Sequence, residues 1–117
     1  MADAYSRVSG NLGVCITSTG TAAGNAAGSQ LEALTAESRL LHITTQIDTK
    51  FLDGNSSVIH SVPNQPDMLK SISKAYYFIK SPKTAIETLS NAISSAISPP
   101  SGPVTVSYTH LTLPTKA

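Results

Sequence analysis

The chain has 117 residues, a length that suits one domain with a core of moderate extent. Charged residues make up 13% and aromatic residues 5%, too few charges for a disordered tail and too few rings for a dense aromatic core. The net charge is +1 without a cluster of Lys and Arg, and no apolar run approaches the ~20 residues that span a bilayer. The composition therefore favours neither nucleic acid nor a membrane as a partner.

In chain order, the patterns predict a helix at 1–8, a strand at 13–18, a turn and helix at 19–36, a strand at 39–45, a short helix at 66–72, a strand at 75–79, a helix at 82–97 and a strand from 103. The first helix has no capping residue before it, so we expect the helix to begin before Met1. The strand at 13–18 is a β-branched run bounded by glycine, which is typical of a buried parallel strand. The helix after it carries Leu31 and Leu34 on its later face.

The helix at 82–97 has the clearest signals. Ser81 can cap its first turn, and Pro99 follows its end. Its apolar residues recur at helical spacing and predict one stripe, made of Ala85, Ile86, Leu89, Ala92, Ile93, Ala96 and Ile97.

The alternation of strands and helices indicates the fold class. It predicts a three-layer α/β domain with a mostly parallel sheet and helices on both faces. In such sheets, ligands bind beyond the carboxyl ends of the strands, which here are followed by residues 17–25 and 46–60. The polar connection at 47–65 is long for a compact domain, and such connections are usually functional or mobile.

Residues 17–25 form a glycine- and hydroxyl-rich turn that leads into a helix. Free backbone N–H groups there can bind an anion or a ring nitrogen, although the turn lacks the lysine of a P-loop and the spacing of G-x-G-x-x-G. In the other interpretation, Gly20, Gly24 and Gly28 form a smooth helix face for a packing neighbour, because each internal helix glycine costs about 1 kcal/mol relative to alanine. The pattern leaves ligand contact and packing both open.

Two histidines and one glutamine are candidates for a site. His60 lies in the long connection and is the candidate for proton transfer or substrate contact, whereas His42 lies inside a strand and is expected to be a satisfied core residue. Gln46, at the end of a strand, can both donate and accept hydrogen bonds to a ligand.

Other chemistry is not supported by the residues. The aspartates of the long connection and the helix after it show no spacing for a metal site and are interpreted as solvated charges: Asp48, Asp53 and Asp67. The nucleophile motif G-x-S-x-G is missing from the sequence, and the single cysteine, Cys15, falls mid-strand, so a self-contained enzyme is disfavoured. Because Cys15 has no disulfide partner and the first residues lack an apolar signal segment, we expect a buried thiol in a cytoplasmic protein.

Four blocks of the sequence match motifs of one known family in the same order. Residues 1–10 are similar to M-A-D-G-Y-A-R-x-[ST]-G, and residues 13–18 to G-V-x-x-x-T-S. Residues 40–46 are similar to P-L-[LV]-x-I-[TS]-G-Q, and residues 100–104 to G-R-P-G-P-V. The ordered set resembles the N-terminal pyrimidine-binding (PYR) domain of thiamine-diphosphate-dependent enzymes, the superfamily of acetolactate synthase, pyruvate oxidase and benzoylformate decarboxylase.

The resemblance implies contacts to a cofactor. The aminopyrimidine ring of thiamine diphosphate would pack against this domain, and a second domain of a partner subunit would hold the diphosphate and Mg²⁺. The residues expected nearest the ring, for contact and shape rather than proton transfer, are Thr19, Gly20, Thr21, Asn25 and Gln46. Two departures bear on this set. The loop at residues 19–25 is one residue longer than the family's G-P-G-A-T-N and is closer to the G-T-G-x-G-N loop of benzoylformate-decarboxylase-like enzymes. Residues 44–46 are Thr-Thr-Gln where the family has T-G-Q.

The resemblance also implies where the acid–base residue lies. In the family motif H-E-Q-x-A-x-x-M-A-D, a glutamate that hydrogen-bonds the pyrimidine precedes the methionine matched by Met1. We therefore expect a fragment that is inactive alone, from a homodimeric or homotetrameric enzyme that cleaves or joins carbon–carbon bonds of 2-oxo acids. The alternative is a non-enzymatic α/β module that binds a small ligand with the glycine loop, and a third interpretation assigns the glycines to dimer packing alone.

Residues 106–117 have a different character. They resemble a translation of a transposon-end adapter used to prepare sequencing libraries, whereas the family pattern here would be V-x-V-x-[IV]-P-x-D. We therefore predict a partial PYR domain at 1–105 and a non-native tail at 106–117, in preference to an ordinary strand. Tyr108 and His110 are excluded from functional argument for this reason.

Overall fold

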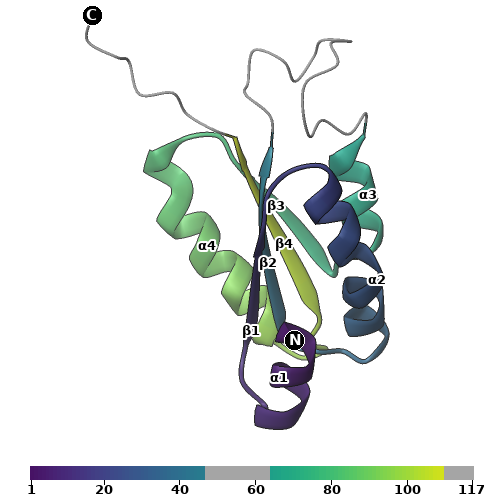
Figure 1. Cartoon of the computed structure of the whole chain (residues 1–117). Coiled ribbons are helices and arrows are strands. Elements are labelled where there is room, and N and C mark those ends of the chain that lie inside the picture. The colour runs from purple at the N-terminus through teal and green to yellow at the C-terminus, as the bar shows by residue number, and fades with distance from the viewer. Residues whose placement is uncertain (47–63, 110–117) are drawn as a thin grey trace, which may run out of the picture.

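The computed structural model describes residues 1–46 and 64–109, and it has the predicted α/β fold (Figure 1). Its elements are α1 (Ala2–Ser9), β1 (Gly13–Thr17), α2 (Thr21–Thr35), β2 (Leu40–Gln46), α3 (Gln65–Ser71), β3 (Ala75–Ile79), α4 (Pro82–Ile97) and β4 (Pro103–Thr109). All the predicted elements are present, and β3 and α4 have the predicted bounds. In the part of the chain that the model describes, no helix combines the length and apolarity needed to cross a bilayer.

The strands form one parallel sheet in the order β1-β2-β4-β3. β4 comes last among the described strands but lies inside the sheet, paired with both β2 and β3. Helix α4 covers one face, and α2 and α3 lie on the opposite face together with α1 (Figure 1). The predicted three layers are therefore confirmed.

The two faces of the sheet differ in chemistry, because alternate residues of a strand point to opposite sides. The side chains toward α4 are apolar and pack on its alanines, forming the core: Leu41, Ile43, Val104, Val106, Ala92 and Ala96. The side chains toward α2 and α3 are polar and buried, namely His42, Thr44, Thr105 and Ser107. Buried polar groups require hydrogen-bond partners, and Gln30 of α2 supplies them to His42 and Thr105, whereas Ser107 Oγ has no partner among the described residues.

Helix α4 packs differently from the prediction. Ser81 caps it as expected, its hydroxyl accepting a hydrogen bond from the Lys83 N–H at 3.3 Å. The predicted single stripe is split, however: Ala92 and Ala96 are fully buried, whereas the isoleucines are exposed, with Ile86 at 81%. Small alanine side chains let the helix approach the sheet closely, which leaves the longer side chains at its flank.

Two burial predictions in the first half are wrong. β1 is an edge strand of the described sheet rather than a buried one, and its Val14 and Ile16 are 50% and 71% exposed. Cys15, expected to be buried, is half-buried. On α2, Leu31 is 51% exposed, and the buried side chains are Ala23, Gln30 and Ala33. Helical spacing defines which side chains share a face of the helix, but not which face lies against the sheet.

Residues 106–109 continue β4, and Val106 is fully buried between β2 and β3. Their non-native origin stays a prediction, because a strand needs only suitable alternation of side chains. Codons across this junction that differ from the adapter would contradict that origin. Residues 110–117, with His110, lie outside the described residues.

Candidate functional site

The carboxyl ends of β1 and β2 meet at one edge of the sheet, and the glycine turn begins there. Gly20 is the N-cap of α2 and has a φ of 76°, in the left-handed region that favours glycine. Its N–H donates to Gln65 Oε1 at 2.8 Å, and the Thr19 hydroxyl donates to the same oxygen at 2.9 Å. The turn after β1 is therefore held by a residue 45 positions later in the chain.

Gln65, the first residue of α3, joins the turn to β2 and was not foreseen from the sequence. Its side chain is fully buried, and besides accepting two hydrogen bonds it donates from Nε2 to the Thr45 carbonyl oxygen at 3.1 Å. It lies between Asn64 and Pro66, outside any periodic apolar pattern, so periodicity alone does not predict a buried role for it. The nearest signal was Pro66, which marks the first turn of a helix.

Thr45 is the second anchor of the turn. The Thr19 N–H donates to the Thr45 hydroxyl oxygen at 2.8 Å. Thr45 stands where the resembling family has the glycine of T-G-Q, and a glycine could not make this contact. The departure from the family pattern therefore supplies a hydrogen bond to the turn that carries the other candidates.

Gln46 lies next to this anchor but faces a different element. It is 7% exposed and lines a pocket of about 320 Å³ between α3 and β3, together with Pro66, Lys70, Tyr76 and Phe78. The Lys70 ammonium lies 5.4 Å from the centre of the Tyr76 ring, and burial raises the pKa of the Tyr76 phenol, which therefore stays neutral. Gln46 thus has an aromatic and cationic environment.

The five candidate contacts do not form one cluster. Thr19 and Gly20 are joined to the end of β2, whereas Thr21 and Asn25 lie on the first turns of α2 with exposed side chains. His60 lies outside the described residues, as do Asp48 and Asp53. Asp67 is exposed, as expected, beside Asn64 and Lys70. Within residues 1–46 and 64–109, no group of three or more His, Cys, Asp or Glu side chains could hold a metal ion.

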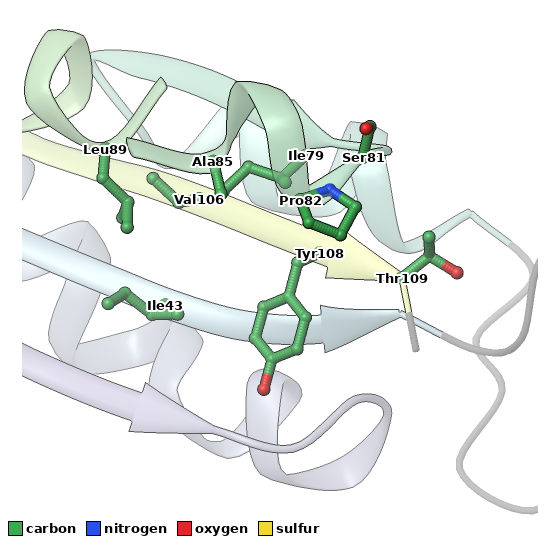
Figure 2. Close-up of a pocket in the computed structure, with 9 residues that line it drawn as sticks. All are labelled: Ile43, Ile79, Ser81, Pro82, Ala85, Leu89, Val106, Tyr108 and Thr109. Atoms are coloured by element: carbon green, nitrogen blue, oxygen red, sulfur yellow. The ribbon is translucent and has the colours of Figure 1, made fainter. Parts of the chain in front are cut away.

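A second pocket lies on the opposite face of the sheet, against α4. Figure 2 shows its lining, in which the Tyr108 ring extends beside Ile43 and Leu89 lies on the α4 side. Its volume is about 420 Å³ and its walls are mainly apolar. Two of its residues, Tyr108 and Thr109, fall in the segment predicted to be non-native. This pocket offers few polar groups to orient a ligand, and we do not assign the site to it.

The glycines of α2 face solvent within this chain. A Cβ built at Gly24 or Gly28 would have no neighbouring atom within 4 Å, so neither glycine is needed for packing among the described residues. We therefore expect Gly28→Ala to raise the free energy of unfolding by about 0.5–1 kcal/mol, because alanine restricts the unfolded chain and favours helix. Urea melts of the full chain would measure this. A loss of stability would mean that an unseen neighbour occupies the space.

His42 is a satisfied core residue, as predicted. It is 1% exposed, its Nδ1 lies 2.6 Å from Gln30 Oε1, and its Nε2 lies 2.8 Å from the Thr17 hydroxyl. Burial lowers the pKa of its imidazole, which favours the neutral ring. The titratable groups that line the small pocket beside it are the Asp3 carboxylate, the Cys15 thiol and the amino group of Met1.

The lowered pKa of His42 predicts that acid destabilises the fold. Above the unfolded-state pKa of about 6.5 the ring is neutral in both states, and below it the unfolded chain binds a proton that the folded chain resists. We expect the free energy of unfolding to fall between about pH 7 and pH 5, by at most about 1.4 kcal/mol per unit from this residue. Urea melts across this pH range should show that the free energy of unfolding changes less with pH in His42→Leu than in the unaltered chain. Equal slopes would contradict the assignment.

Comparison with known proteins identifies the chain. The family model described as "Thiamine pyrophosphate enzyme, N-terminal TPP binding domain" matches residues 1–72, which include α1, the glycine turn, Gln46 and α3. A search of curated proteins found no match. The match covers more than half of the 117 residues. The chain therefore belongs to the family of N-terminal thiamine-pyrophosphate-binding domains of thiamine pyrophosphate enzymes.

Proposed function

We propose that this chain supplies the surface that receives the aminopyrimidine ring of thiamine diphosphate in an enzyme that cleaves or joins carbon–carbon bonds of 2-oxo acids. The observation that carries the proposal is the family match over residues 1–72. It includes the turn after β1 and the end of β2, where ligands bind in open parallel sheets.

The donor set at this edge suits an aminopyrimidine. The ring has nitrogen acceptors and an amino donor, and it therefore needs partners of both kinds. The exposed Thr21 hydroxyl and Asn25 amide can each donate and accept, and Gln46 has an amide of the same kind. Within residues 1–46 and 64–109, no buried Lys or Arg lies at the turn that would suit a diphosphate better than a ring.

The cofactor, when bound, supplies a carbon nucleophile for the substrate carbonyl, and this chain's residues serve to bind and orient it. Gln65 and Thr45 hold the turn at residues 19–20, so that the start of α2 is presented in one conformation. Such preorganisation lowers the cost of binding. Diphosphate and Mg²⁺ are assigned by this proposal to a separate domain of a partner subunit.

The position of the acid–base glutamate rests on the motif at residues 1–10: it would precede Met1 in a helix continuous with α1. The parent enzyme is further proposed to be a cytoplasmic homodimer or homotetramer. Reading the gene upstream tests the position of the glutamate: an in-frame H-E-Q-like segment is the expected result. A native start codon with nothing related before it would favour a non-enzymatic binding module.

Calorimetric titration of thiamine diphosphate with Mg²⁺ tests the binding itself, in the enzyme that contains this chain. We expect saturable binding that Asn25→Ala and Gln46→Ala weaken by about ten-fold, the effect of losing a well-placed hydrogen bond. Asn64→Ala is the matched control, since this exposed amide contacts only Asp67 in the described hydrogen bonds. Absence of binding in the parent enzyme would refute the proposal.

A further inference from the structure

A row of buried and half-buried polar side chains crosses the sheet from the residues after α3 and from β4 to the ends of β1 and β2. Its members are Ser73, Thr105, Gln30, His42, Thr17 and Thr44, joined in that order by hydrogen bonds. None of them belongs to the candidate cofactor contacts. The row is called the His42 relay below.

The orientation of the Gln30 amide follows from a count of hydrogens. The Ser73 hydroxyl donates to the Leu69 carbonyl oxygen at 2.6 Å, so the 2.8 Å contact between Ser73 and Thr105 uses the hydrogen of Thr105. Both hydroxyl oxygens then have only acceptor capacity left for Gln30, whose Nε2 lies 2.7 Å from Ser73 and 2.8 Å from Thr105. A flipped amide would place oxygen against oxygen, so Oε1 must face His42.

This orientation fixes the tautomer of His42. Gln30 Oε1 can only accept, and His42 Nδ1 lies 2.6 Å from it, so Nδ1 carries the proton. In the neutral ring Nε2 is then an acceptor, and the Thr17 hydroxyl, 2.8 Å away, donates to it. The single hydrogen of Thr17 is thereby committed to His42.

The relay ends at the turn that carries the cofactor contacts. Because the Thr17 hydrogen is committed to His42, the 3.0 Å hydrogen bond between the two hydroxyls uses the hydrogen of Thr44, whose Oγ1 also lies 3.2 Å from the Ser18 carbonyl oxygen. Ser18 immediately precedes Thr19 and Gly20. The conformation of the turn is therefore supported by Thr17 and Thr44 at the strand ends, and by the hydrogen bonds that Gln65 and Thr45 accept from Gly20 and Thr19.

We infer that His42 is a positioning residue: with the proton on Nδ1, it holds Thr17 through Nε2 and so sets the conformation of residues 18–20 toward the cofactor. The expected effect on cofactor binding rests on the proposed function, whereas the tautomer of His42 and its effect on residues 18–20 do not. His42 touches no ligand itself, because it is 1% exposed and both of its nitrogens have partners within the chain.

A pair of amide variants separates the two sides of the imidazole. An asparagine amide reaches the position of Nδ1 and keeps the bond to Gln30, whereas a glutamine amide reaches the position of Nε2 and keeps the bond to Thr17. We expect His42→Gln to bind thiamine diphosphate with Mg²⁺ within about three-fold of the unaltered enzyme, and His42→Asn to bind about ten-fold more weakly. Thr17→Val, with His42 retained, should match the loss in His42→Asn and serves if that variant folds poorly.

Nuclear magnetic resonance of the full chain tests the structural part without cofactor. We expect the imidazole ¹⁵N signals to show a protonated Nδ1 and an unprotonated Nε2, and the amide signals of Thr19 and Gly20 to move in His42→Asn but not in His42→Gln. A ring protonated on Nε2, or equal effects of the two variants on these amides and on affinity, would overturn the inference. If the unaltered enzyme binds no thiamine diphosphate, the proposed function fails, and the amide signals still decide the role of His42.

Discussion

Replacing Gly13 with alanine is expected to displace α1 from the sheet and to lower the free energy of unfolding by about 3 kcal/mol. A Cβ at Gly13 would overlap the Ala2 carbonyl oxygen and lie 2.9 Å from the Ala2 carbonyl carbon. Both are backbone atoms, so no side-chain rotation relieves the overlap, and α1 must move as a unit. Its movement would also strain the hydrogen bond that the Ser38 hydroxyl donates to the Asp3 carboxylate.

Urea melts of the full chain would measure the loss, and Gly28→Ala is the matched control because its Cβ meets open space. Amide signals of α1 should shift in Gly13→Ala and stay in place in the control. Moving α1 should also displace the proposed acid–base glutamate, because that residue would lie in a helix continuous with α1. A Gly13→Ala chain within about 0.5 kcal/mol of the unaltered one would show that α1 is loosely held.

Replacing Gln65 with leucine is expected to cost about 2–4 kcal/mol of stability and to loosen the turn at residues 19–20. The change removes one acceptor for the Gly20 N–H and the Thr19 hydroxyl, and the donor for the Thr45 carbonyl oxygen. The site is buried, so water does not readily replace these bonds. Leucine nearly conserves the volume, and the loss therefore reports on the polar contacts rather than on a cavity.

Chemical denaturation gives the stability, and amide hydrogen exchange at Gly20 gives the local effect. Asn64→Ala is the adjacent exposed control and should stay within about 0.5 kcal/mol of the unaltered chain. Under the proposed function, Gln65→Leu also weakens binding of thiamine diphosphate. Unchanged exchange at Gly20 would mean that Thr45 alone holds the turn, and the assignment of Gln65 as its main anchor would be withdrawn.

Much of the fold follows from local patterns. The aromatic run of β3, and α4 with Ser81 before it and prolines after it, were predicted with their observed bounds because capping, periodicity and stop signals agree there. Burial was harder to predict: Leu31 is exposed, while Gln30 beside it is buried. Periodicity defines the faces of a helix but not which face meets the sheet, and here the sheet beneath α2 is polar.

The residues of the candidate site were likewise only partly predictable from the sequence. Thr19, Gly20 and Gln46 could be chosen from sequence because strand ends and glycine turns are local features, and the ordered motifs pointed to a thiamine-diphosphate enzyme. The positioning roles of Gln65, Thr45 and His42 could not be assigned in that way, because their partners lie 12 to 46 positions away in the chain.

For this protein, the order of residues alone specifies the elements, their parallel connection and the family. Those properties depend on neighbours a few positions apart and on motifs that keep their order. The placement of β4 inside the sheet, the polar face that α2 covers and the His42 relay emerge only when distant segments pack together. Hydrogen bonds between buried groups depend on distances in space, and a pattern along the chain does not contain them.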